Sequence, residues 1–314
     1  YDGRSIYTVR PPPMIELLGI MFNVIAPIFV VVGAGALIGR RFRPDPAAIS
    51  VLLIYLFIPA LAFNGIATSD LTGGELLGIA GVATGIALLA AVIGMGLGGL
   101  LHFERRLESG FLISVIMMNA ANYGIPLNRF AFGPQGEQRA IVYYVMSVVL
   151  GAVLGIFFAS RGTASVRVAL LNVLRVPISY AAIAGLIVNL AGWQPPLLLE
   201  RGISILAQGA VPGMLVLLGL QLARGTTLRG RWLPITLASG MRLVLAPLLA
   251  VPLALALGLS GVSFQVAVVE SSMPTAVMAS ALATQFGSDA DFTAAVTLVS
   301  TVASIVTLSV LLAL

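Results

Sequence analysis

The sequence predicts an all-α membrane protein with about ten transmembrane helices, arranged as two inverted five-helix repeats with broken crossover helices in spans 4 and 9. Three observations support this fold class. The chain has 314 residues, of which 59% are hydrophobic and only 9% charged, whereas soluble proteins carry roughly 25% charged residues. Apolar runs of membrane-spanning length recur along the chain. Polar, proline-containing interruptions occur at corresponding places in its two halves. Together these observations exclude a water-soluble fold.

Apolar runs between charged or turn-rich segments define the expected spans. The first five are expected at 15–39, 46–67, 75–101, 108–132 and 137–159. The second five are expected at 174–191, 196–223, 231–258, 260–286 and 289–314. The predicted repeats are therefore 14–160 and 161–314. Residues 1–13 are polar and lack the apolar core of a signal peptide, so we expect an upstream extension or a cloning remnant there.

The arginines are distributed unevenly over the two sides of this layout. All 17 basic residues are Arg, and ten of them lie in loops on one side against five on the other. The positive-inside rule places the richer side in the cytoplasm. We therefore expect a multi-pass protein of the cell inner (plasma) membrane with both termini extracytoplasmic. Because the loop arginines act as orientation signals, no nucleic-acid partner is expected.

Four prolines mark corresponding positions in the two halves. Because five is an odd number, a second five-span unit that resembles the first lies upside down in the bilayer. Pro59 in span two corresponds to Pro212 in span seven, and both spans are expected to be broken or kinked there. Pro126 in span four corresponds to Pro274 in span nine, and polar residues accompany both. This symmetry of interruptions is typical of secondary transporters.

Broken helices at membrane depth free backbone groups, which must be buried in protein or line a wet cavity. Polar side chains next to the interruptions can satisfy those groups or bind a solute. The sequence therefore predicts a solute-binding site near the middle of the bilayer. The candidate substrate-binding residues are Asn119, Asn122, Tyr123, Ser271, Ser272, Thr275 and Arg242.

Glu270 is the only acidic residue deep within a predicted span. Such a charge is costly and marks an ion or proton pathway. Its carboxylate, the carbonyls freed around Ser271 and Met273, and the Asn119 side chain would form an oxygen shell suited to sodium. The same carboxylate can instead take up a proton. A permanent ion pair with Arg242 is the structural alternative.

Arg242 lies near the middle of span eight. A guanidinium is the preferred partner of a carboxylate, so the residue indicates an anionic substrate. The alternatives are the ion pair with Glu270 and snorkelling toward the membrane surface.

Two further patterns bear on packing and on function. Gly35-x-x-x-Gly39 is typical of close helix packing in membranes. The chain has one His and no Cys, and no nucleophile, paired acids or metal-ligand spacing accompanies them. No enzyme is expected, and no cofactor other than a coupling sodium ion or proton.

The motifs Asn119-Ala-Ala-Asn-Tyr-Gly-Ile-Pro-Leu and Glu270-Ser-Ser-Met-Pro-Thr-Ala-Val resemble the auxin efflux carrier family. The resemblance is to its short prokaryotic permease form over residues 14–314, and more distantly to the bile acid:sodium symporters. The stretches 26–39 and 287–301, together with Pro212, support it. The resemblance implies ten helices in two inverted repeats, with spans four and nine crossing as broken helices.

The resemblance also implies a mechanism. Spans 1, 2, 6 and 7 form a scaffold, spans 3–5 and 8–10 form a transport domain, and an elevator movement alternates access; many members are homodimers. Glu270 matches an acidic sodium ligand of the bile acid symporters, and Asn119 matches a polar ligand in span four. Prokaryotic members are associated with malate, malonate and similar anions. We therefore expect a secondary active transporter of a small organic anion, a carboxylate or an auxin-like molecule, with sodium or proton coupling. The alternatives are a bile acid:sodium symporter-like carrier and a channel or solute-binding membrane receptor.

Overall fold

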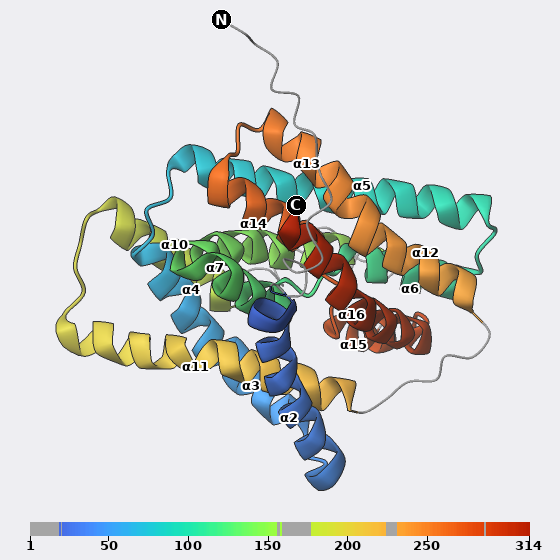
Figure 1. The fold of residues 1–314 in the computed structure, drawn as a ribbon, viewed down its shortest axis with the longest axis horizontal. Coiled ribbons are helices and arrows are strands. Elements are labelled where there is room, and N and C mark those ends of the chain that lie inside the picture. The colour runs from blue at the N-terminus through green and yellow to red at the C-terminus, as the bar shows by residue number, and fades with distance from the viewer. Residues whose placement is uncertain (1–18, 20, 156–157, 159–176, 224–230, 286) are drawn as a thin grey trace, which may run out of the picture.

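The protein is described here by a computed structural model that places residues 19, 21–155, 158, 177–223, 231–285 and 287–314. The regular elements of these residues are helices (Figure 1). In addition, one isolated antiparallel β-bridge pairs Met118 with Thr275. Residues 1–13, for which an extension is expected, lie outside the described part, as does most of the junction between the two predicted repeats.

Six described helices are long and apolar enough to cross a membrane. They match predicted spans 1, 2, 3, 7, 8 and 10, so the prediction of an all-helical multi-pass membrane protein is confirmed. These helices cover Phe22–Phe42, Pro46–Ala67, Gly73–Leu100, Leu197–Leu222, Trp232–Ala256 and Ala290–Ala313. A shorter apolar helix, α10 (Pro177–Leu190), lies within predicted span six.

Several of these long helices contain a π-helical turn (η) that divides them into named parts. The first is η1 (Met21–Ile25) followed by α2 (Ala26–Phe42), and the second is α3 (Pro46–Leu52), η2 (Leu53–Phe57) and α4 (Ile58–Ala67). The third is α5 (Gly73–Leu100) and the fourth is α11 (Leu197–Leu222). The fifth is α12 (Trp232–Gly240), η5 (Met241–Leu245) and α13 (Ala246–Ala256), and the sixth is α16 (Ala290–Ala313).

The segments predicted as spans four and nine are interrupted. The first consists of α6 (Arg105–Ile116), an irregular stretch, η3 (Ala120–Gly124) and the start of α7 (Ile125–Leu150), which η4 (Gly151–Gly155) extends. The second consists of α14 (Gly261–Ser271), an irregular stretch and α15 (Met278–Gln285). A positive φ of 67° at Gly133 interrupts the helical geometry of α7 between predicted spans four and five.

The two other predicted proline sites differ from each other. Pro59 lies in the first turn of α4, directly after the π-helical turn η2, so the helix is irregular there. Pro212 lies inside α11, which continues unbroken from Leu197 to Leu222. The helix is therefore not broken at Pro212, and a kink there stays a prediction. A proline removes one helical hydrogen bond, and a helix held by neighbours on both sides can continue through that loss.

Local sequence signals begin the helices. Thr72 and Glu75 form a capping box at the start of α5, in which the Thr72 hydroxyl accepts from the Glu75 backbone N–H at 3.2 Å and Glu75 Oε2 accepts from the Thr72 N–H at 3.0 Å. Asp45 caps α3 and Asp289 caps α16, each with a side-chain oxygen that accepts from one backbone N–H. Each cap satisfies N–H groups that a helix start leaves without partners.

The helices pack as two groups. In the first, α11 lies along α2 and α4, and α10 lies along α4; Figure 1 shows these helices together at the lower left. In the second, α5 contacts α6, α7 and α13, α14 contacts α7 and α13, and α15 contacts α16. The first group is joined closely at Gly35 and Gly219, where an added Cβ would lie 2.5 Å from Val216 O and 2.0 Å from Val32 O, respectively. Gly35 therefore has the close packing role that its motif predicts.

Candidate functional site

The two helix interruptions cross each other as a short antiparallel pair. The Asn119 N–H donates to Pro274 O at 2.8 Å, and the Ala276 N–H donates to Met117 O at 2.8 Å. The Thr275 hydroxyl donates to the carbonyl of Ser114 at 2.8 Å. Each interruption thus supplies partners for backbone groups that the other has freed, as a nonhelical segment at membrane depth requires. We call residues 117–119 and 272–277 the crossover.

Arg242 is buried, with a relative exposure of 1%, and its guanidinium is directed at the crossover. Nε and Nη2 donate to Met273 O at 3.0 and 2.9 Å, and Nη2 also donates to Ser271 O at 3.0 Å. Nη1 donates to Val115 O at 3.4 Å. The described residues show no ion pair between Arg242 and Glu270 within 4.0 Å. The guanidinium therefore stabilises carbonyls that the two interruptions expose.

Glu270 is fully buried at the end of α14, with a relative exposure of 0%. Its Oε1 accepts from Asn128 Nδ2 at 2.8 Å, while Glu270 Oε2 and Asn128 Oδ1 have no hydrogen-bond partner. Gly124 leaves the necessary space, since a Cβ there would lie 2.4 Å from Glu270 Oε2. The hydrogen-bonded pair Glu270 and Asn128 therefore keeps two buried acceptor oxygens without a partner.

The sodium shell expected from the sequence is only partly assembled. The carbonyls of Ser271 and Met273 are occupied by Arg242. Asn119 lines a cavity that Glu270 does not reach. Among the described residues there is also no group of three or more His, Cys, Asp or Glu side chains that could hold a metal ion.

A cavity of about 330 Å³ lies against the crossover. Its wall is mainly apolar, from residues such as Ile58, Leu217 and Leu282, with a small number of polar groups. Two buried polar atoms of its lining residues have no hydrogen-bond partner: Asn119 Nδ2 and Gln221 Oε1. A volume of this size, with an apolar wall and few polar atoms, is typical of a small-molecule site.

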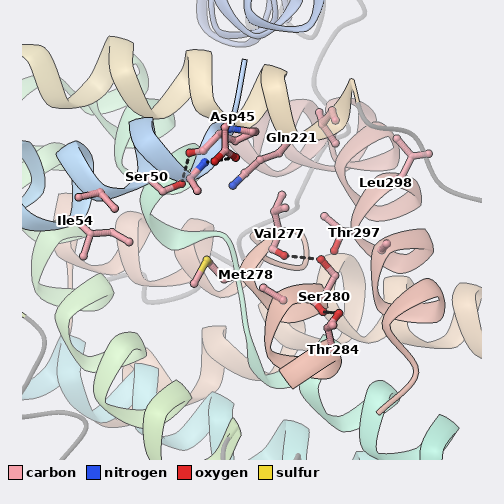
Figure 2. Close-up of a pocket in the computed structure, with 16 residues that line it drawn as sticks. Asp45, Ser50, Ile54, Gln221, Val277, Met278, Ser280, Thr284, Thr297 and Leu298 are labelled. Carbon is pink, nitrogen blue, oxygen red and sulfur yellow. Dashed lines mark hydrogen bonds between the residues drawn. The ribbon is translucent and has the colours of Figure 1, made fainter. Parts of the chain in front are cut away.

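A second cavity, of about 620 Å³, adjoins the first. Gln221 and Val277 line both, and Figure 2 shows the Gln221 side chain pointing from α11 toward Val277 across the space. The second cavity extends to Asp45, which follows the arginine-rich end of α2. The two cavities together lead from the crossover to that end of the bundle.

The predicted site residues divide into two sets. Asn119 and Asn122 line the smaller cavity. The others line neither cavity: Ser272 donates to Leu243 O at 3.4 Å, and Tyr123 OH accepts from Ser304 at 3.4 Å. The Ser271 hydroxyl pairs with Tyr143 OH at 2.9 Å. Ser272, Thr275 and Arg242 make hydrogen bonds at the crossover, whereas Tyr123 bonds to Ser304 of α16; none of these side chains lines either cavity. Pro126 lies in the first turn of α7 and Pro274 in the crossover.

Sequence reasoning missed several residues of the site. Gln221, Ser50 and Ser147 line the smaller cavity but come from helices whose relative placement the sequence does not give. Asn128 was within reach of a sequence argument, because it lies four residues after Gly124 and so on the same helix face.

The fold, the crossed interruptions and the cavity beside them define a multi-pass membrane transport protein. A family model described as "Membrane transport protein" matches residues 160–312. An uncharacterized transporter of Methanothermobacter thermautotrophicus is 29% identical over 275 residues, which cover 86% of this chain and 89% of the relative. One of Methanocaldococcus jannaschii is 26% identical over 291 residues, covering 90% and 94%. Residues 160–312 thus match this membrane transport protein family, the auxin efflux carrier family, and both relatives that are similar over most of the chain are transporters.

Proposed function

We propose that this protein is a secondary active transporter of a small organic anion, which binds in the cavity beside the crossover. The observation that carries the proposal is the cavity of about 330 Å³, whose lining residues include Asn119 with its buried, unpartnered Nδ2. An amide N–H is a donor for a carboxylate oxygen. The described residues that line the cavity include no Arg, Lys or His, so the amide side chains recognise the anion and the apolar wall receives its carbon skeleton.

The proposed mechanism is elevator-type alternating access. Spans 1, 2, 6 and 7 form the scaffold and spans 3–5 and 8–10 the transport domain, which agrees with the two groups of packed helices. The cavity lies between these groups, since Leu217 and Gln221 come from one and Asn119 and Val277 from the other. The proposal includes two inverted five-helix repeats and extracytoplasmic termini in the plasma membrane. The structure then corresponds to an inward-open conformation, because the cavities lead to the arginine-rich end.

Glu270 is the proposed coupling group, for a proton or for sodium. It is buried next to the crossover, it is hydrogen-bonded to Asn128, and its Oε2 has no hydrogen-bond partner. Substitution Glu270→Gln keeps the size of the side chain and removes its charge. The variant should transport at a rate that no longer depends on an ion gradient.

Transport in proteoliposomes tests the function. A panel of radiolabelled organic acids, from malate and malonate to aromatic and aliphatic monocarboxylates, is offered with and without a proton or sodium gradient. Saturable uptake of one class by the wild-type protein supports the proposal. Uptake of none of them, or single-channel currents far above about a thousand ions per second, would contradict a carrier whose domain moves on the microsecond-to-second scale.

A further inference from the structure

The guanidinium of Arg242 lies at backbone carbonyl oxygens that the two helix interruptions leave without helical partners. Its three nitrogens contact the carbonyls of Val115, Ser271 and Met273, at the ends of α6 and α14 and in the crossover. The carbonyl end of a helix carries a partial negative charge. A cation at this place therefore stabilises the interruption of both helices.

Interrupted helices of secondary transporters commonly use this arrangement to hold a coupling ion, with unwound carbonyls and half-helix C-terminal ends as ligands. In this protein carbonyls of this kind, those of Ser271 and Met273, already accept hydrogen bonds from the Arg242 side chain. A hard cation takes roughly six oxygen ligands, whereas the hydrogen-bonded pair Glu270 and Asn128 offers two unpartnered side-chain oxygens, Glu270 Oε2 and Asn128 Oδ1. These two atoms do not make a sodium shell without the carbonyls that Arg242 holds.

We infer that Arg242 is a tethered substitute for a coupling cation: its guanidinium permanently occupies the cation position of the crossover, and transport is therefore independent of sodium, which leaves the proton as the coupling ion proposed for Glu270. The inference rests on the proposed carrier function. Arg242 is a positioning residue, because it touches the crossover backbone and not the cavity. Its planar fork donates to two carbonyls in a fixed geometry, whereas a lysine ammonium is a compact charge on a flexible stem.

The wild-type protein gives the first test. Its apparent Tm is measured in detergent with sodium chloride or choline chloride at equal ionic strength, over a concentration series. A ligand that binds the native state raises Tm in a saturable manner. We expect sodium and choline to give the same Tm within about 1 °C. A saturable rise with sodium alone would overturn the inference.

The charge of Arg242 is tested by a matched pair of variants. Arg242→Lys keeps a positive charge, and Arg242→Gln keeps N–H donors without a charge. We expect Arg242→Lys to retain roughly a tenth of wild-type transport, because it keeps a positive charge. We expect Arg242→Gln to lose about a hundredfold, since removal of a buried charge leaves its former partners without compensation. Equal transport by the two variants would overturn the inference.

Chemical rescue provides the third test. In Arg242→Ala the guanidinium position is vacated, and millimolar guanidinium ion, far below denaturing concentrations, should raise the Tm of this variant by several degrees and restore part of its transport. Sodium is tested in parallel. Arg231→Ala is the control, because Arg231 is about half exposed and pairs with Asp289 at the surface; guanidinium should not change it. A folded Arg242→Ala protein that ignores guanidinium contradicts the inference.

The tests separate the two proposals. If wild-type protein transports no organic anion, the proposed function fails, while the sodium and guanidinium effects on Tm still report on the cation position. If the wild type transports an anion only with sodium, the proposed function stands and the inference about Arg242 fails.

Discussion

The backbone N–H of Asn119 donates to the carbonyl oxygen of Pro274 across 2.8 Å, although 155 positions separate the two residues in the sequence. The reciprocal bond from Ala276 to Met117 makes this a two-residue antiparallel pairing inside a helical protein. Because each interruption satisfies the other, neither segment can become helical without leaving its partner's backbone groups unpaired in an apolar environment. The crossover is therefore a fixed frame against which side chains such as Asn119 are positioned.

The first prediction concerns Asn119 itself. Asn119→Ala removes the unpartnered Nδ2 of a residue that lines the cavity and keeps the backbone bond to Pro274. We expect substrate affinity to fall about tenfold, corresponding to the loss of one hydrogen bond to a charged group. The Tm should change little, because Nδ2 has no protein partner to lose. Binding is measured by thermal shift or isothermal titration with the transported anion.

Asn189→Ala is the matched control for this variant. Asn189 donates to the carbonyls of Ala67 and Ser69 at 3.1 and 2.9 Å and lines neither cavity. The Asn189→Ala variant should be less stable than the wild type and should bind the transported anion with unchanged affinity. The reverse pattern in the two variants would contradict the proposed binding site.

The second prediction concerns the space beside Glu270. In Gly124→Ala the new Cβ would lie 2.4 to 2.7 Å from the carboxyl atoms of Glu270, which is fully buried and has no room to withdraw. We expect a loss of about 1–3 kcal/mol in stability from overpacking, together with altered ion dependence of transport. Gly96→Ala serves as control, because nothing lies within 4 Å of its Cβ position on α5. If both variants behave alike, Glu270 is not confined as the structure indicates.

Much of the fold could be predicted from the sequence because it depends on local signals. Apolar runs set the long helices to within a few residues, and the Thr72-to-Glu75 capping box begins α5 where the pattern indicates. The interruptions near Pro126 and Pro274 were also foreseeable, since proline removes a donor wherever it occurs. Pro212 shows the limit of that argument, because the neighbours of a helix decide whether it breaks.

The partners of the site residues could not be predicted, because they depend on how distant helices meet. Glu270 and Arg242 were obvious as charges, but Arg242 binds carbonyls whose direction is set by the folded crossover. Gln221 appears ordinary in the sequence and becomes part of the cavity only when α11 lies across from Val277. Sequence identifies chemically unusual residues, whereas the tertiary structure decides which groups they face.

The third prediction concerns the contact of α2 with α11. Gly35→Ala places a Cβ 2.5 Å from the carbonyl oxygen of Val216, a backbone atom that cannot turn aside. We expect the helices to separate, at a cost of about 1–3 kcal/mol and a Tm lower by roughly 5 °C. Gly33→Ala, on the same helix with nothing within 4 Å of its Cβ, should be neutral or slightly stabilising. An equal Tm for the two variants would contradict the close packing.

The fourth prediction concerns orientation. The sequence contains no Cys, so one introduced cysteine is a unique reporter for a membrane-impermeant maleimide. Gln194 and Glu104 are both exposed and lie in loops on opposite sides of the predicted layout. With ten loop arginines on the Glu104 side and five on the other, the positive-inside rule assigns Glu104 to the cytoplasm.

In intact cells we therefore expect Gln194→Cys to be labelled and Glu104→Cys to remain unlabelled until the membrane is permeabilised. The cysteine-free parent is the control for background labelling. The opposite pattern would reverse the orientation, and the cavities that lead from Asn119 past Gln221 to Asp45 would then open outside the cell. The described conformation would in that case be the outward-open one, with the same crossover and the same binding site.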